Sequence, residues 1–300
     1  MPTSSNKRQF LDPETISKIE NLSLVARLVV EGFVIGLHRS PYHGFSVEFA
    51  EHRPYMPGDE VKHIDWKLYG KTDRFYVKQF EEETNLKAYL ILDASNSMDF
   101  GSGEVSKLQY GSYLGAALTY LMLQQQDAVG LTIFDRGIRS IVPPSSRPSY
   151  LNIILGQMQD LETRRDTDIA TTLHELADRV KRRGLVILIS DLLDDPDHVI
   201  NGLKHFRHKK HEVLVFHVLD HQELSLEYDR QVELTDLESG ERMTTEPRLI
   251  RESYREEMER FVEYYRQQCL SNHIDYIQLT TDQPFNLALS EYLTKRQRLG

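Results

Sequence analysis

Two short runs in the sequence are apolar at almost every position, as is typical of strands buried on both faces of a sheet. They are AYLIL, at residues 88–92, and LVILIS, at residues 185–190. Further strands are predicted at 128–134, 137–142, 213–219 and 274–279, and helices at 107–124, 150–161, 169–182, 197–206, 248–270 and from Phe285 onward. Since strands that alternate with helices form right-handed βαβ units, we predict an α/β fold with a mainly parallel sheet flanked by helices.

Two hairpins are predicted to depart from this parallel order. The strands at 128–134 and 137–142 are joined by only two residues, Asp135 and Arg136, which predicts an antiparallel pair. Residues 232–244 are typical of a hairpin on the surface.

The chain before residue 86 has a different character. A helix is predicted to begin at Pro13, because Asp12 can cap it and proline suits the first turn. Its apolar face is formed by Ile16, Ile19, Leu22, Val25, Leu28 and Val29. Short extended pieces broken by Gly and Pro follow at 36–83, with strand-like alternation at 45–49 and 74–80. The predicted division is a flexible tail (1–12), an N-terminal helix with a small β-rich subdomain (13–85) and the α/β domain (86–300).

Polar side chains follow the two most apolar strands directly. Asp93 comes after the first run and Asp191 after the second, so both are expected at the carboxyl ends of parallel strands, where such sheets bind ligands. Thr167 is expected at the same edge, because the helix that it precedes must run antiparallel to the second strand. Ser95 and Ser97 alternate with Asp93 and can face the same way. We therefore expect these five side chains to share one rim.

Two carboxylates and three hydroxyls form an oxygen-only set, which suits a hard divalent cation such as Mg²⁺ or Mn²⁺. Without a cation, neighbouring aspartates would raise one another's pKa. The alternative is that Thr167 or Asp168 only caps the helix that follows, and that residues 191–197 form a solvated loop capping the next one. The joint placement of the five residues favours a cation site.

Composition limits the other classes of function. The formal net charge of −10 argues against a protein that mainly binds nucleic acid. A single cysteine, Cys269, allows no internal disulfide and fits a reducing compartment, so a cytoplasmic protein is expected. The most apolar long window near the start, residues 22–37, contains Arg27 and Glu31 and is too short to span a bilayer, so no membrane span or targeting segment is predicted.

The set Asp93-x-Ser95-x-Ser97, Thr167 and Asp191 resembles the metal-ion-dependent adhesion site of von Willebrand factor A domains. The upstream block HRSPYHGFSVEFAEHRPYMPGDEVKHIDWK, with TDRFYVKQFEEETN, is similar to the signature of the bacterial "domain of unknown function 58" proteins. The resemblance implies a Rossmann-like von Willebrand factor A fold. It also implies a Mg²⁺ ion held by Ser95, Ser97 and Thr167, and by Asp93 and Asp191 directly or through water.

What the resemblance implies about function is an adaptor or co-chaperone that works with an AAA+ ATPase of the MoxR type, since such families are typically encoded beside these ATPases. Two features depart from the common pattern. No glycine precedes Thr167 in RRDTDI, and Leu192 stands where a glycine often follows the aspartate.

Three functions are therefore open. The first is a non-enzymatic, cation-dependent protein-interaction module whose metal takes a carboxylate from the partner. The second is a metal-dependent hydrolase acting on a phosphoester, although the three site segments contain no evident general base. The third is a structural scaffold with an empty site. We expect the first, and no enzymatic activity; the oligomeric state cannot be predicted from the sequence.

Overall fold

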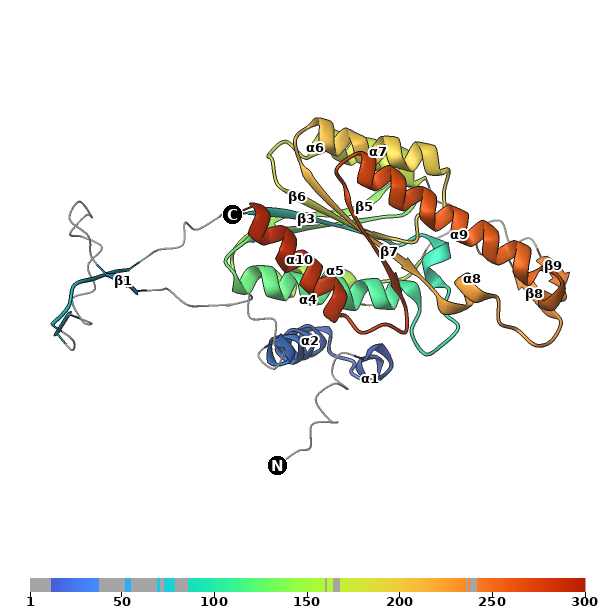
Figure 1. Cartoon of the computed structure of the whole chain (residues 1–300), viewed down its shortest axis with the longest axis horizontal. Helices are drawn as coiled ribbons and strands as arrows, with labels where there is room; N and C mark the ends of the chain where they lie inside the picture. Colours follow the sequence, from blue (N-terminus) through green and yellow to red (C-terminus); the bar gives the residue numbers. More distant parts are fainter. Residues whose placement is uncertain are drawn as a thin grey trace, which may run out of the picture.

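A six-stranded sheet forms the centre of the molecule (Figure 1). The computed structural model describes residues 12–37, 52–54, 69–70, 73–78, 86–159, 161–163, 168–235, 237 and 242–299. The strands lie in the order β10 (Asp275–Thr280), β7 (Glu212–Leu219), β6 (Leu185–Ser190), β3 (Lys87–Asp93), β4 (Ala128–Phe134) and β5 (Ile138–Ser145). All neighbouring pairs are parallel except β4 with β5, which is antiparallel. The predicted α/β fold with a mainly parallel sheet is confirmed.

Helices cover both faces of this sheet (Figure 1). One face packs against α4 (Lys107–Gln124), α5 (Tyr150–Met158) and α10 (Asn286–Leu299). The other packs against α6 (Ile169–Arg179), α7 (Pro196–His208) and α9 (Pro247–Ser271). Along β6, alternate residues enter the two cores: Ile187 joins the first, whereas Val186 and Leu188 join the second. The all-apolar runs are therefore explained by burial on both faces.

The N-terminal helical region differs from its prediction, because it forms two helices. α1 (Pro13–Ser17) begins at the Asp12 cap as expected, but the helix is interrupted and α2 (Leu22–Leu37) starts anew. The side chain of Asn21 accepts a hydrogen bond from the Leu24 amide at 3.0 Å, which stabilises this second start. Buried residues of α2 pack with those of α4, so both N-terminal helices share the core of the α/β part. The division at residues 85 and 86 stays a prediction.

Smaller elements complete the described chain. β1 (His52–Pro54) pairs antiparallel with β2 (Tyr76–Lys78), which lies within one of the predicted strand-like stretches; the other, 45–49, lies outside the described residues. β8 (Val232–Thr235) and β9 (Arg242–Thr245) form the expected surface hairpin. The 3₁₀ helix η3 (Asn96–Asp99) and the short helix α8 (His221–Ser225) were not predicted. No helix in the described part of the chain combines the length and apolarity needed to cross a membrane.

Candidate cation site

Asp93, the last residue of β3, lies at the centre of a buried polar cluster. Its Oδ1 accepts a hydrogen bond from the Ser95 amide at 2.9 Å, and its Oδ2 accepts one from Ser190 Oγ at 2.6 Å. Burial raises the pKa of the Asp93 carboxyl to about 7, and the negative charge of Asp191 adds to this, while the bonds from the serines oppose it. The expected repulsion between Asp93 and Asp191 is therefore present.

The two serines after Asp93 turn their hydroxyls toward one another. Ser95 is fully buried, Ser97 nearly so, and their Oγ atoms lie 3.0 Å apart. Ser95 precedes the 3₁₀ helix η3, yet its side chain makes no capping bond there. In an octahedral Mg²⁺ site with ligands at about 2.1 Å, adjacent oxygens are about 3.0 Å apart. The two hydroxyls form a hydrogen bond, at a spacing that two neighbouring ligands would also have, and capping does not account for Ser95.

Asp191 follows β6 and is also fully buried. Its backbone carbonyl accepts a hydrogen bond from His217 Nε2 at 2.8 Å, which links it to the adjacent strand β7. Its Oδ1 accepts a bond from the Leu193 amide at 3.3 Å. The other carboxylate oxygen, Oδ2, lies 2.7 Å from the ammonium group of Lys107. Asp191 thus stands at the predicted edge, but one of its oxygens already binds a cation of the protein itself.

Leu192 explains how the Asp191 loop turns without a glycine. Its backbone φ is 55°, in the left-handed region that glycine adopts most readily. The Leu192 amide donates to Ser190 Oγ at 2.9 Å, and its carbonyl accepts from the Tyr265 hydroxyl at 3.0 Å. The leucine side chain is fully buried in the core. Packing and two hydrogen bonds therefore hold a non-glycine residue in this conformation.

Lys107 is the main residue of the cluster that sequence reasoning missed. It is the first residue of α4, its side chain is 0% exposed, and its Nζ also lies 2.5 Å from Oε1 of Glu223 in α8. Burial alone would lower the pKa of the Lys107 ammonium, but the two carboxylates together raise it. A lysine in the first turn of a helix gives no signal of burial. Glu223 lies in α8, four residues after the end of β7.

The remaining predicted residues lie at the edge of this cluster or outside the described chain. Thr167 lies outside the described residues. Asp168 caps α6 through a bond from the Thr171 amide at 2.9 Å, as the capping alternative stated. Asp194 accepts from the Ile169 amide at 2.9 Å, and Asp195 caps α7. These three carboxylates are helix caps, whereas Asp93 and Asp191 are not.

The described residues fit a hard divalent cation in chemistry and in charge. Asp93, Asp191 and Glu223 contribute three carboxylates and Lys107 one ammonium, so the cluster carries a net charge of −2 when all are ionised. Uncompensated buried charge is costly, and one divalent cation would balance it. Across the described part of the chain, no three His, Cys, Asp or Glu side chains are grouped closely enough to hold a metal. A cation here would therefore depend on the serine hydroxyls.

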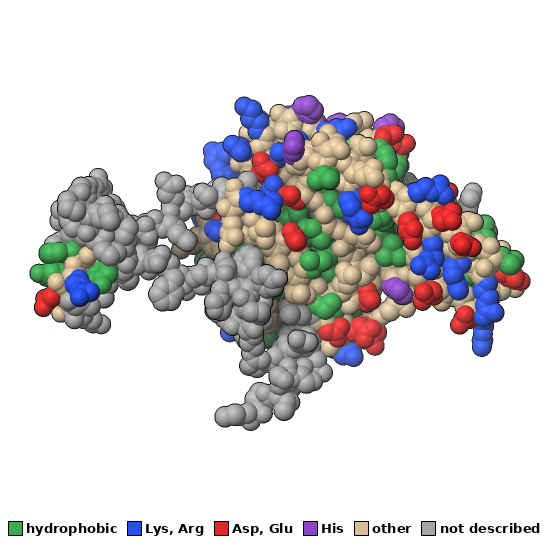
Figure 2. Space-filling model, in the orientation of Figure 1, with side chains coloured by type: hydrophobic (Ala, Val, Ile, Leu, Met, Phe, Trp, Pro, Cys, Tyr) green, Lys and Arg blue, Asp and Glu red, His purple; other side chains and the backbone are tan. Residues whose placement is uncertain are grey.

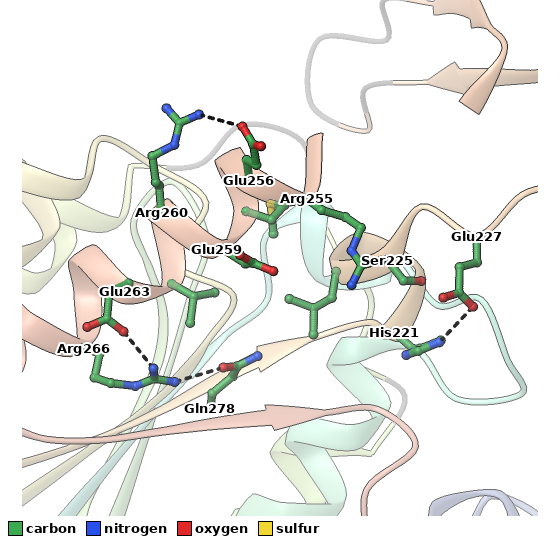
Figure 3. Close-up of a pocket in the computed structure, with 13 residues that line it drawn as sticks. His221, Ser225, Glu227, Arg255, Glu256, Glu259, Arg260, Glu263, Arg266 and Gln278 are labelled. Atoms are coloured by element: carbon green, nitrogen blue, oxygen red, sulfur yellow. Dashed lines mark hydrogen bonds and ion pairs between the residues drawn. The ribbon is translucent and has the colours of Figure 1, made fainter. Parts of the chain in front are cut away.

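A separate pocket of about 830 Å³ lies between α8 and α9 (Figure 3). Most of its charged side chains pair with one another, as Arg266 does with Glu263 and His221 with Glu227. Acidic and basic side chains are likewise interspersed over the surface toward the hairpin end of the molecule (Figure 2). The pocket is lined by charged and apolar side chains, among them Leu224, Met258 and Val262, and lacks the buried oxygen cluster of the cation site.

Comparison with known proteins finds similar chains in mycobacteria. It is 28% identical over 244 residues to an uncharacterized protein from Mycobacterium tuberculosis, covering 80% of this chain and 76% of that one. Solved structures similar to it include the conserved hypothetical protein BatB from Bacteroides thetaiotaomicron, with a TM-score of 0.49, 15% identity and coverage of 71% and 99% of the two chains.

The VWA domain of SpRpn10 is also similar, with a TM-score of 0.37, 13% identity and coverage of 69% of this chain and 94% of that domain. These structural likenesses are distant, and the fold described above follows from the strand order itself. The family evidence is stronger, since residues 51–263 match the model described as "Protein of unknown function DUF58". Because that match spans more than half of the chain, the protein belongs to the DUF58 family.

Proposed function

We propose that the protein is a non-enzymatic interaction module that binds Mg²⁺ or Mn²⁺ through Asp93, Ser95, Ser97 and Asp191, with Thr167 as a further ligand. The observation that carries this proposal is the buried pair of serine hydroxyls, 3.0 Å apart, beside a cluster with uncompensated negative charge. When bound, the cation would supply an open coordination position for a carboxylate of the partner.

The proposed partner is an AAA+ ATPase of the MoxR type in the cytoplasm. This part of the proposal rests on the family resemblance and on the chemistry of the site. A divalent cation held by protein oxygens with one open coordination position would accept a carboxylate oxygen of the partner as its remaining ligand. The partner's contribution is therefore expected to be an Asp or Glu on an exposed loop.

A hydrolytic role is less well supported, because the histidine beside the cluster is fully engaged. His217 Nε2 bonds to the Asp191 carbonyl, and its Nδ1 lies 2.5 Å from the Tyr276 hydroxyl. Burial lowers the pKa of the His217 imidazole to about 4, although the nearby Asp191 opposes this. With both ring nitrogens bonded, His217 is not free to take a proton from water at the site.

Calorimetric titration with Mg²⁺ and Mn²⁺ tests the cation directly. Wild type is expected to bind, and Ser97→Ala is expected to bind weakly, because it loses one hydroxyl ligand. Ser271→Ala is the control, since the Ser271 hydroxyl donates to the Gln267 carbonyl within α9 and lies outside the ligand set. If wild type produces no binding heat, the cation has no part in the function.

Co-purification tests the partner. The ATPase is expected to be retained by the wild-type chain in Mg²⁺ and released by a chelator, and the Ser97→Ala variant should retain less of it. If the chelator leaves retention unchanged, partner binding does not depend on the cation. Turnover of a phosphoester panel that disappears in Asp191→Ala would instead establish the hydrolase.

A further inference from the structure

The ammonium group of Lys107 is a fixed part of the cluster. Its Nζ lies between Asp191 Oδ2 and Glu223 Oε1, at 2.7 and 2.5 Å, and its side chain is 0% exposed. The start of α4 is held by a reciprocal capping box between Ser106 and Gln109. The Lys107 amide also donates to the Phe100 carbonyl at 2.9 Å. These bonds fix the backbone of Lys107, and two ion pairs hold its ammonium group in the cluster.

Glu223 is held equally firmly on the other side. Its Oε2 accepts a hydrogen bond from the Asp220 amide at 2.8 Å, which completes a capping box at the start of α8. Asp220 in turn accepts from the Ser102 amide at 3.0 Å and from Thr281 Oγ1 at 2.8 Å. Both carboxylates around Lys107 are therefore preorganised, and the ammonium withholds one oxygen of Asp191 from any other cation.

We propose that Lys107 is an internal counter-cation that sets how much positive charge the site accepts. This inference rests on the proposed function, because it concerns the same ligand set. With the ammonium present and all three carboxylates ionised, the net charge is −2, which matches one divalent ion. Without it, the same ligands would carry −3 and favour a trivalent ion. Lys107 is therefore a specificity-determining residue that acts through its charge and by occupying one oxygen of Asp191.

Two substitutions with opposite charge effects test this. Lys107→Met keeps the length of the side chain and makes the site more negative, so Mn²⁺ should bind more tightly, on the order of tenfold or more, and Tb³⁺ should gain still more. Glu223→Gln makes the site less negative, so Mn²⁺ should bind more weakly by a similar factor. Neither change touches Asp93, Ser95 or Ser97.

The matched control is Lys295→Met. Lys295 Nζ also lies between two carboxylates, at 2.9 Å from Glu212 and 2.7 Å from Asp275, but these residues begin β7 and β10 at the opposite edge of the sheet. Its removal should leave Mn²⁺ and Tb³⁺ affinities within about twofold of wild type, because the charge is remote and screened.

The double variant Lys107→Met/Glu223→Gln restores the net charge of −2 and covers the case in which Lys107→Met alone does not fold. It should bind Mn²⁺ more tightly than Glu223→Gln does, and close to wild type. Tb³⁺ luminescence and Mn²⁺ calorimetry measure all four variants beside wild type.

The outcomes separate this inference from the proposed function. If wild type binds Mn²⁺ but both single variants weaken binding, Lys107 has only a structural role and the inference is overturned. If wild type does not bind but Lys107→Met does, the lysine stands in for the ion; the inference then holds and the cation-dependent function fails. If no variant binds any cation, both are overturned.

Discussion

Two edges of the same sheet each hold a lysine between two carboxylates, and they differ in charge balance and burial. At the edge formed by the carboxyl ends of the parallel strands, the carboxyl edge, Lys107 faces Asp191 and Glu223 with its side chain 0% exposed. Asp93 adds a further acid there. At the opposite edge, where β7 and β10 begin, the amino edge, Lys295 faces Glu212 and Asp275 with its side chain 11% exposed.

The charges of this group at the amino edge balance, because Arg207 Nη1 also binds Glu212 at 2.6 Å and two cations therefore meet two carboxylates. At the carboxyl edge two negative charges are unmatched when Asp93, Asp191 and Glu223 are all ionised. An ion-pair group whose charges balance is explained by its role in the fold, whereas a buried group with unbalanced charge indicates a ligand site. The comparison therefore teaches that charge balance, more than the presence of ionisable residues, marks the functional edge of this sheet.

The largest expected difference between the edges concerns the two lysines. Without added cation, Lys107→Met should lower the free energy of unfolding by about 3–5 kcal/mol, because it leaves Asp191 and Glu223 buried and unpaired. Lys295→Met should cost about 1 kcal/mol, because its partners are partly exposed and Arg207 remains. Urea unfolding in a chelator measures both values. Equal losses would remove the distinction between the edges.

Acid should weaken the carboxyl edge through His217. Its pKa is lowered by burial to about 4, from 6.5 for an exposed histidine, so protonation favours the unfolded chain. The stabilisation is complete above pH 6.5 and is lost as the pH falls toward 4, by up to about 3 kcal/mol. Unfolding of wild type and His217→Gln between pH 7.5 and 4 should show the two converging in acid. A constant difference across this range would contradict the assignment.

The left-handed residues of the two edges should respond oppositely to glycine. Leu192 is fully buried, so Leu192→Ala should cost about 2–4 kcal/mol, and Leu192→Gly about 1 kcal/mol less, because glycine tolerates the positive φ. At the amino edge Lys210 has a φ of 65° and is exposed, so Lys210→Gly should stabilise the fold by up to about 1 kcal/mol. Thermal unfolding ranks these variants, and an alanine variant more stable than glycine at 192 would exclude backbone strain there.

The smallest expected effects have opposite signs. Without a cation, Asp93→Asn should raise the free energy of unfolding by about 1 kcal/mol or less, because it removes the repulsion with Asp191. Asp127→Asn, at the amino edge, should lower it by about 1 kcal/mol, because Asp127 Oδ2 binds Arg296 Nε at 2.7 Å. Added Mn²⁺ should stabilise wild type more than Asp93→Asn, so that this variant becomes the less stable of the two. It should not change the ranking of Asp127→Asn and wild type. A loss of stability in both variants without a cation would mean that both edges are balanced.

The sheet and half of the cluster could be predicted because they follow from local patterns. All-apolar runs identify strands buried on both faces, and residues that follow such strands must meet at one edge. These patterns predict that Asp93, Ser95, Ser97 and Asp191 lie at one edge of the sheet. The break between α1 and α2 was missed because the apolar face continues across it, and only Asn21, a new cap, marks the second start.

Lys107 and Glu223 could not be predicted as a pair. Lys107 and Asp191 are 84 residues apart, and nothing in SKLQYG distinguishes a buried lysine from a solvated one. α8 has five residues, too few to show a helical period. The partners of a buried charge depend on how helices pack over the sheet edge, which is a property of the tertiary structure.

Two loop amides at the carboxyl edge donate to side chains that are themselves buried: Ser95 to Asp93, and Leu192 to Ser190. Loop amides usually exchange their hydrogens with solvent quickly, because water reaches them directly. These two can exchange only when the cluster opens, so their hydrogen-exchange rates would report its opening in the native protein. They offer a way to follow events at Asp93 and Asp191 without altering either residue.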